Sequence, residues 1–311
     1  MSLTVFRQIL DRIPITVRIL NLWHRGEPLA APDFPEMVAE ASRRRIKAHT
    51  HTNGILLTRS DIAGRLVDAR LSQISIAMDG GTEESYQARR PGGTLAGVIQ
   101  GIEALAEAKR RAKSPYPRIV VECLVGNQPE EEFLSVRKMA VEAGANAVKF
   151  KTLRLENLDD LQTALTELPA DRKLWRYEIA GDRLRMKRTR STCRRLGFST
   201  LIAWNGDIYP CCFYLKFFAP FGNILESRFK DLWFGDSLAK FREVVRQDRD
   251  KIPMCRNCTE GLPYLYVNPR KSCRWDDGCK TDIINTETTE NTRRAERKFY
   301  WKLNKTKNLT S

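Results

Sequence analysis

Residues 117–153, PRIVVECLVGNQPEEEFLSVRKMAVEAGANAVKFKTL, decide the fold class of this chain. The stretch begins and ends with apolar, β-rich runs, and the segment between them carries apolar residues at helical spacing. Two strands joined by such a helix lie parallel, because the crossover returns the chain to the edge of the sheet where the first strand began. The stretch therefore predicts a βαβ unit.

The same alternation extends towards the N-terminus. Three further apolar runs precede this unit, and stretches with helical spacing such as LAGVIQGIEALAEAKRR separate them. The three runs are ITVRILNLW (15–23), KAHTHTNG (47–54) and LSQISIAMD (71–79). Five strands with intervening helices, after a helix-like segment at 3–12, predict an α/β fold: a (βα) barrel or an open sheet without its first strand.

Polar residues on these strands predict a binding cavity. In a parallel αβ barrel, helices cover the outer face of the strands, so polar strand residues point inward. The residues that this rule places in the lumen are Ser75, Ala77, Asp79, Glu122, Lys149 and Lys151. Hydroxyl, carboxylate and ammonium groups together suit a polar ligand. The alternative is that some of these charges lie on an open edge of the barrel.

Composition limits the function classes. The chain has 311 residues, 42% of them hydrophobic, which suffices for about two domains with sizeable cores. No uncharged apolar run reaches the ~18 residues of a membrane-spanning helix. The first residues, MSLTVFRQILDRIP, lack the compact apolar region of a secretory signal. We therefore expect a cytoplasmic protein, in which clustered cysteines more often hold metal than form disulfides.

Basic residues are concentrated in two segments. Lys and Arg exceed Asp and Glu by 53 − 38 = 15, and the segments 172–195 and 293–307 contribute most of the excess. Such segments suit an acidic substrate or an acidic electron-donor protein, although a solvated basic surface is the simpler interpretation and is favoured over nucleic-acid binding. Residues 156–192 predict a basic linker with one helix, and residues 266–311 a basic, mobile tail.

Four cysteines in the C-terminal half predict a metal centre. The Asn-Gly pair at 205–206 lies between two short β-like runs and predicts a hairpin that places Cys211 at the end of its second strand. Cys255 and Cys258 form a CxxC pair that can reach one metal. Together with Cys193, these thiolates fit zinc or a [4Fe–4S] cluster. Zinc ribbons usually use two CxxC pairs, so two single ligands favour iron–sulfur.

The remaining cysteines have less specific interpretations. Cys123 lies in an apolar strand and is expected to be a small core residue. Cys212 could substitute for its neighbour Cys211 as a ligand. Cys273 and Cys279 could belong to a second metal site, but the spacing between them matches no ligand motif.

With these patterns in place, the sequence resembles the radical S-adenosylmethionine (SAM) enzymes, in the subgroup with a C-terminal SPASM domain. The matching segments follow the order of the family's motifs: LNLWHRGEPL (20–29), HTNGILLT (51–58), ISIAMDG (74–80), YQARRPGG (86–93), NGDIYPC (205–211) and GNI (222–224), together with the four cysteines. They look like the second-strand Gly-Glu-Pro motif, the third strand, the fourth strand with its arginine, and a short SPASM domain. The matches span residues 15–260.

The resemblance implies both a fold and an activity. The fold is a partial (βα)6 TIM-like barrel lacking its first strand at 1–155, followed by a small SPASM-like iron–sulfur domain with a β-hairpin at 193–265. The activity is that of an iron–sulfur oxidoreductase that cleaves SAM and abstracts hydrogen through a 5′-deoxyadenosyl radical. Its substrate would be a peptide or a small biosynthetic intermediate.

The resemblance also implies site residues. The residues that would bind SAM are Gly26, Glu27, Ser75, Asp79 and Arg90. The first two would meet its amino group, the next two its ribose, and Arg90, or its neighbour Arg89, its carboxylate, for which an arginine fork is well suited. The residues that would hold an auxiliary [4Fe–4S] cluster are Cys193, Cys211, Cys255 and Cys258. Glu122, Lys149 and Lys151 are the candidates for substrate chemistry.

One departure concerns the radical-generating cluster. The family binds it through a CxxxCxxC loop, and no CxxxCxxC occurs in these 311 residues. As written, the chain should therefore not perform the radical chemistry. A truncated enzyme is the favoured interpretation, because true loss of a barrel strand would expose a parallel sheet edge. The alternatives are a non-catalytic iron–sulfur or zinc binding partner derived from that fold, and a zinc-stabilised nucleic-acid binder.

Overall fold

The computed structural model describes residues 1–267 except 60, 156, 189–191, 215–218 and 263–265. The described residues all belong to one compact unit, residues 1–269. Cys273, Cys279 and nearly all of the predicted tail lie outside the described residues.

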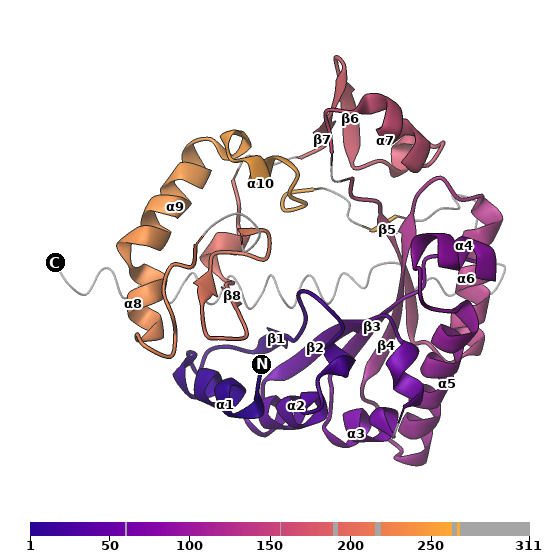
Figure 1. The fold of residues 1–311 in the computed structure, drawn as a ribbon, viewed down its shortest axis with the longest axis horizontal. Helices are drawn as coiled ribbons and strands as arrows, with labels where there is room; N and C mark the ends of the chain where they lie inside the picture. Colours follow the sequence, from indigo (N-terminus) through magenta and orange to yellow (C-terminus); the bar gives the residue numbers. More distant parts are fainter. Residues whose placement is uncertain (60, 156, 189–191, 215–218, 263–265, 268–311) are drawn as a thin grey trace. The chain divides into compact units, whose positions relative to one another are not determined.

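A sheet of parallel strands forms the centre of the N-terminal region (Figure 1). Its parallel strands, in both spatial and chain order, are β1 (Ile19–Asn21), β2 (Lys47–Thr52), β3 (Gln73–Ala77), β4 (Arg118–Val125) and β5 (Ala147–Thr152). Each of these strands pairs in parallel with the next one along the chain. Successive βα units produce this order, so the predicted α/β fold is confirmed.

The sheet also has a sixth strand, which the sequence did not predict. Strand β10 (Tyr266–Val267) pairs antiparallel with β5, Tyr266 opposite Lys151. The segment predicted as a mobile tail from residue 266 therefore begins inside the sheet. Two residues are too few for a periodic pattern, so no sequence signal marks this strand.

One helix before the first strand and others between the strands cover one face of the sheet. They are α1 (Leu3–Arg12), α2 (Phe34–Arg43), α3 (Ile62–Asp68), α4 (Glu83–Arg89), α5 (Leu95–Arg111) and α6 (Glu130–Glu142). Within the described ranges, no helix is both long and apolar enough to cross a membrane. In α6, Phe133, Val136 and Ala140 repeat at helical spacing and are buried, and the chain leaves the helix at Gly144 with φ +96°.

Alternation along the strands separates an apolar face from a polar one. Ile74 and Ile76 of β3 and Val121 of β4 belong to the main core beneath the helices. Successive strand residues point to opposite faces, so Ser75 and Glu122 lie on the face that the helices do not cover. This face carries the predicted lumen residues.

Residues 157–188 form more than the linker with one helix that the sequence predicted. Helix α7 (Leu161–Glu167) is followed by an antiparallel hairpin, β6 (Tyr177–Ala180) with β7 (Arg183–Met186). These elements share a separate core that contains Tyr177, Leu184 and Met186. The alternation is present in RLRM, but the exposed arginines between the apolar residues dominate the composition and conceal the strand.

The cysteine-rich region contains the predicted hairpin. Strands β8 (Leu201–Ile202) and β9 (Ile208–Tyr209) pair antiparallel around the Asn-Gly turn, and helices α8 (Phe229–Phe234), α9 (Asp236–Gln247) and α10 (Pro253–Arg256) follow. Gly206 has φ +91°, and a Cβ there would lie 2.7 Å from Asn223 Oδ1. Only glycine therefore fits this turn without displacing its neighbours.

Helix α1 connects the cysteine-rich region to the sheet region. Ile9 of α1 is buried in a small apolar cluster with Ile208 and Ile224. Arg12 Nη1 also donates a hydrogen bond of 3.1 Å to the Ile224 carbonyl. These contacts fix the hairpin against the first helix, so the cysteines are carried on a supported element.

Candidate functional site

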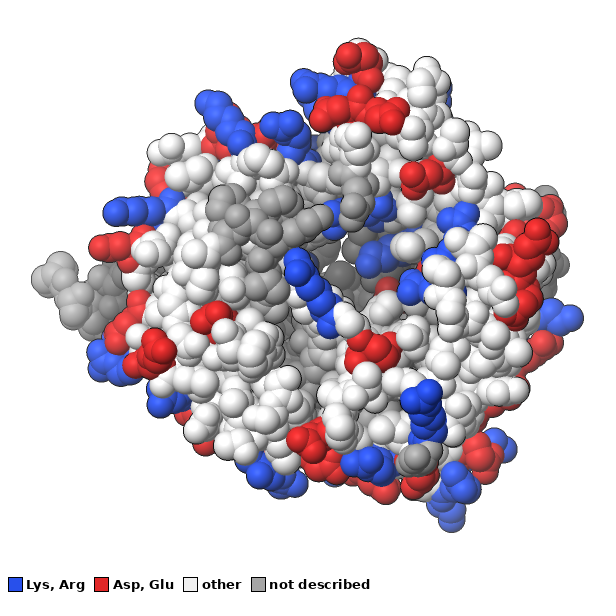
Figure 2. Space-filling view, viewed as in Figure 1, with Lys and Arg blue, Asp and Glu red and all other residues white. Residues whose placement is uncertain are grey.

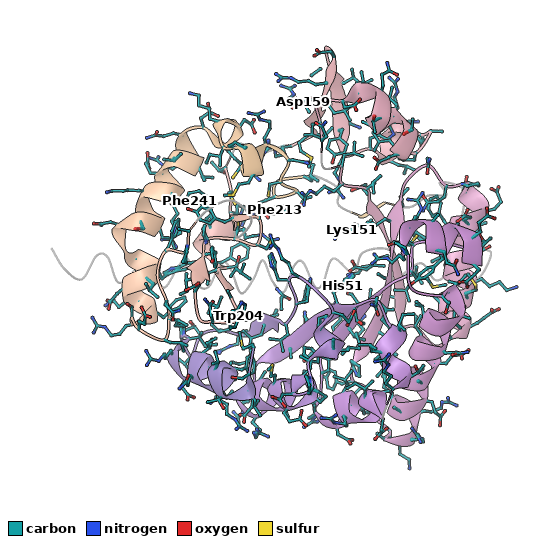
Figure 3. All side chains as sticks on the ribbon, viewed as in Figure 1. His51, Lys151, Asp159, Trp204, Phe213 and Phe241 are labelled. Carbon is teal, nitrogen blue, oxygen red and sulfur yellow. The ribbon has the colours of Figure 1, made fainter. Side chains whose placement is uncertain are left out.

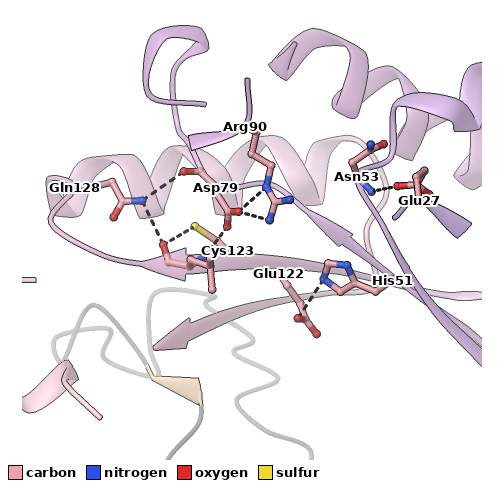
Figure 4. Close-up of polar contacts among 9 residues, drawn as sticks. Glu27, His51, Asn53, Asp79, Arg90, Glu122, Cys123 and Gln128 are labelled. Carbon is pink, nitrogen blue, oxygen red and sulfur yellow. Dashed lines mark hydrogen bonds and ion pairs between the residues drawn. The ribbon is translucent and has the colours of Figure 1, made fainter. Parts of the chain in front are cut away.

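Three polar side chains from adjacent strands meet on the uncovered face of the sheet, and Figure 4 shows two of them, His51 and Glu122. Ser75 Oγ of β3 donates a hydrogen bond of 3.2 Å to Glu122 Oε1 of β4. His51 Nε2 of β2 lies 3.6 Å from Glu122 Oε2. His51 and Ser75 are register partners, so the strand pairing itself brings them together. The result is a compact polar cluster centred on the Glu122 carboxylate.

Two lysines complete this cluster from the next strand. Glu122 is opposite Lys149, and Lys151 is one pleat further along β5. Figure 2 shows Lys and Arg side chains around the hollow at the centre of the view, where Figure 3 labels Lys151. Burial opposes ionisation of Glu122, but the hydrogen bond with His51 and the charges of Lys151 and Lys149 outweigh it and lower the Glu122 pKa to about 2. The lumen thus holds an ionised carboxylate.

This low pKa predicts an acid-sensitive contribution to stability. The Glu122 pKa falls from an ordinary 4.5 to about 2 on folding, so the stabilisation is complete above pH 4.5 and is lost as pH falls towards 2. We expect the carboxyl to account for about 2 kcal/mol of unfolding free energy lost between pH 7 and pH 3. Urea unfolding at both values should show a smaller loss for Glu122→Gln, while Glu103→Gln, on an exposed face of α5, should match the wild type. Equal losses in all three proteins would contradict the assignment.

Arg90 is held by a buried carboxylate. Its Nε lies 2.7 Å from Asp79 Oδ2, and the other Asp79 oxygen accepts a hydrogen bond of 2.7 Å from the backbone N–H of Leu124. Asp79 is only 2% exposed. Both of its oxygens are therefore occupied in positioning Arg90 and the end of β4. In the described part of the chain, Arg90 Nη1 has no partner, so this nitrogen can meet a ligand.

The Gly-Glu segment lies at the carboxyl end of β1. The Glu27 carboxylate accepts hydrogen bonds from Thr52 Oγ1 at 2.6 Å and from the backbone N–H of Asn53 at 2.8 Å. Glu27 therefore ties the loop after β1 to the end of β2. Gly26 has φ +73° and nothing within 4 Å of the position that a Cβ would take. The backbone at Gly26 is therefore accessible to a ligand.

The four predicted cysteines line one cavity. Cys193 precedes a short helical turn, Cys211 follows β9, and Cys255 and Cys258 lie in and just after α10. None of them forms a disulfide. Three separate chain segments thus contribute cysteines to one space, and the role of these cysteines as ligands stays a prediction. Cys212 is exposed and is not among the residues that line the cavity.

The chemistry of these thiols favours a bound cation. Burial, reinforced by the neighbouring cysteines, raises the pKa of Cys255 to about 12, and burial raises that of Cys211 to about 11. Ionised sulfurs in this cavity therefore need positive charge beside them, which a metal centre supplies. Among the described residues, no three His, Cys, Asp or Glu side chains are grouped to hold a single ion. Four thiolates around one cavity fit an iron–sulfur cluster or a zinc ion.

Sequence reasoning missed two residues of these sites. His51 was not among the predicted lumen residues, although its two-residue alternation with His49 and its place on a polar strand were a usable signal. Arg249 lines the cysteine cavity, yet it lies in the charged run RQDRDK, which is typical of solvent-exposed chain. No local pattern distinguishes it. Cys123, by contrast, is 1% exposed within the main core, as predicted.

Two family models match the chain in the regions just described. Residues 10–140 match the radical SAM superfamily, and residues 193–259 match SPASM, an iron–sulfur cluster-binding domain. The first covers strands β1 to β4 of the parallel sheet, with Glu27, Ser75 and Arg90. The second begins at Cys193 and ends just after Cys258, so all four cavity cysteines lie inside it.

Curated relatives extend over most of the chain at low identity. The chain is 23% identical over 291 residues to a tungsten-containing aldehyde ferredoxin oxidoreductase cofactor-modifying protein of Pyrococcus furiosus, covering 83% of this chain and 79% of that one. It is 24% identical over 285 residues to an AdoMet-dependent heme synthase of Methanosarcina barkeri, covering 81% and 77%.

Solved structures share the fold. Streptococcus suis SuiB bound to S-adenosylmethionine superposes with a TM-score of 0.54 at 15% identity, covering 84% of this chain and 64% of that one. SuiB bound to precursor peptide SuiA gives a TM-score of 0.52 at the same identity and coverage. At this identity the likeness establishes the arrangement of elements.

Proposed function

Because the chain belongs to the SPASM-domain subgroup of the radical SAM superfamily, we propose that it serves a SAM-dependent radical modification of a peptide. In this proposal the uncovered face of the sheet binds SAM and substrate. The cavity of Cys193, Cys211, Cys255 and Cys258 holds an auxiliary [4Fe–4S] cluster.

The observation that carries the proposal is the cysteine cavity. Four free thiols from three chain segments line one space, and three of them, Cys193, Cys211 and Cys255, also pack in the apolar core of this region. Their number and softness match the thiolate set of a [4Fe–4S] cluster. When bound, such a cluster supplies one-electron transfer. The chain's own part is to fix the four sulfurs and to exclude water from them.

The SAM site is proposed at the carboxyl ends of β1, β2 and β3, where parallel α/β sheets commonly bind ligands. The open backbone at Gly26 would accept hydrogen bonds from the SAM ammonium, and Arg90 would bind its carboxylate. Ser75 would face the ribose. Asp79, predicted from the family's motifs to face the ribose as well, is instead proposed to position Arg90, since both of its oxygens are occupied.

The substrate is proposed to be a peptide with an acidic group. Lys149, Lys151 and His51 surround Glu122 on the uncovered face, so positive charge predominates there. The likeness to SuiB, which has been solved with a precursor peptide, is in keeping with a peptide. Removal of hydrogen from it needs three further thiolates for the radical-generating cluster, since the 311 residues contain no CxxxCxxC.

Metal content and SAM binding test the proposal directly. Protein purified without oxygen and reconstituted with iron and sulfide should be brown and contain both elements in equal amounts, equivalent to one [4Fe–4S] cluster per chain. Equilibrium dialysis should also detect SAM binding to the loaded protein. Colourless protein with one zinc per chain would overturn the cluster assignment, and loaded protein that binds no SAM would overturn the SAM site.

A further inference from the structure

A buried arginine lines the cysteine cavity. Arg249 begins the short helical turn η6 (Arg249–Lys251) and is 3% exposed. Its Nε, Nη1 and Nη2 atoms are all buried, and none forms a hydrogen bond within the described part of the chain. Its side chain lines the same cavity as Cys193, Cys211, Cys255 and Cys258. A guanidinium group without a hydrogen-bond partner among the described residues therefore belongs to the same cavity as the four sulfurs.

The acidic residues beside Arg249 are engaged with other cations. Asp250 pairs with Arg188, and Asp248 lies 3.3 Å from Lys251 Nζ. Arg195, which also lines the cavity, has Glu260 at 3.5 Å. Burying an unpaired charge is strongly unfavourable, so a group in the cavity that supplies negative charge and acceptor atoms would resolve this cost.

We propose that Arg249 donates hydrogen bonds to the sulfur atoms of the cluster in this cavity and raises its reduction potential. This inference rests on the proposed function, in that it requires a [4Fe–4S] cluster on the four cysteines. A thiolate-bound cluster carries net negative charge, which increases by one on reduction. A buried cation beside it stabilises the reduced state more than the oxidised one, and hydrogen bonds to the sulfurs act in the same direction.

A cluster with a raised reduction potential exchanges electrons with a donor or acceptor whose own reduction potential is similarly high. Surrounding apolar side chains, among them Leu196, Phe241 and Met254, limit water in the cavity. The field of one guanidinium is therefore weakly screened there. Arg249 acts on electron transfer through the cluster and has no part in bond making.

The test compares reduction potentials of cluster-loaded full-length proteins by EPR-monitored redox titration. Arg249→Gln should lower the potential by 59 mV or more, a tenfold change in the reduction equilibrium of a one-electron couple. Arg249→Lys, which keeps the charge but loses the planar fork, should fall between this variant and the wild type. Arg246→Gln removes the same charge from the surface of α9, where Arg246 pairs with Glu243, and should leave the potential unchanged.

A second measurement does not depend on the Arg249→Gln variant. Wild-type protein with 15N-labelled arginine should show nitrogen hyperfine coupling to the reduced cluster, and Arg249→Lys should lose most of it. A wild type with a cluster but no coupling, or Arg249→Gln with an unchanged potential, would overturn the inference while the proposed function stands. A wild type that takes up no cluster would overturn the proposed function itself. If Arg249→Gln does not load, the coupling in the wild type and in Arg249→Lys decides.

Discussion

Cys255→Ser is expected to abolish the iron–sulfur cluster and to destabilise the cysteine-rich region. Cys255 lies in α10, is 8% exposed and belongs to the core of this region with Leu196 and Tyr209. Metal binding to a site of this kind is part of the folding free energy of its domain, because the unfolded chain has no preformed site. We expect iron to fall from one cluster per chain to near none, and the unfolding free energy of this region to fall by about 4 kcal/mol or more.

The matched control is Cys212→Ser. Cys212 is adjacent to Cys211 but is exposed and does not line the cavity, so its loss should change neither iron content nor stability. Iron and sulfide analysis, the visible absorption of the cluster and urea unfolding give the three readouts. If Cys212→Ser loses the cluster while Cys211→Ser keeps it, then Cys212 is the ligand from this segment. Retention of the full cluster by Cys255→Ser would remove Cys255 from the ligand set.

The sequence predicts the parts of this protein in which local pattern and three-dimensional neighbourhood coincide. Strand alternation places Ser75, Glu122 and Lys149 on one face, and parallel pairing then makes them neighbours. The Asn-Gly turn fixes a hairpin, so Cys211 returns towards Cys193. In both cases a local sequence pattern is enough to predict which residues become neighbours in the folded protein.

Prediction fails where burial depends on contacts between distant segments. Arg249 is polar in sequence and buried in the structure, because the core containing Val245 and Ile252 encloses the turn on which it lies. The motif assigns Glu27 to a ligand, which stays a prediction, but it does not reveal the hydrogen bonds that Thr52 and Asn53 donate to the Glu27 carboxylate. Both features depend on contacts between residues far apart in the sequence, and local sequence patterns do not predict such contacts.

Arg90→Gln is expected to weaken SAM binding by about 10- to 100-fold. A charge-assisted hydrogen bond contributes about 1.5–3 kcal/mol, and each 1.4 kcal/mol corresponds to a factor of ten in affinity. Asp79 holds Arg90 through Nε and leaves Nη1 without a partner in the described structure, so the guanidinium is already oriented for a carboxylate. Little side-chain entropy then remains to be lost on binding. Equilibrium dialysis with labelled SAM measures the effect.

The neighbouring arginine supplies the control for this substitution. Arg89 Nη2 donates a hydrogen bond of 2.9 Å to Asn127 Oδ1, away from Asp79, and Arg89→Gln should leave SAM affinity unchanged. Because Arg90→Gln also leaves the buried Asp79 carboxylate without its cation, Arg90→Lys is needed as a second variant. It keeps the charge beside Asp79 but lacks the fork, so it should fold like the wild type and still bind SAM more weakly. If Arg89→Gln weakens SAM binding and both Arg90 variants do not, then the carboxylate is bound by Arg89.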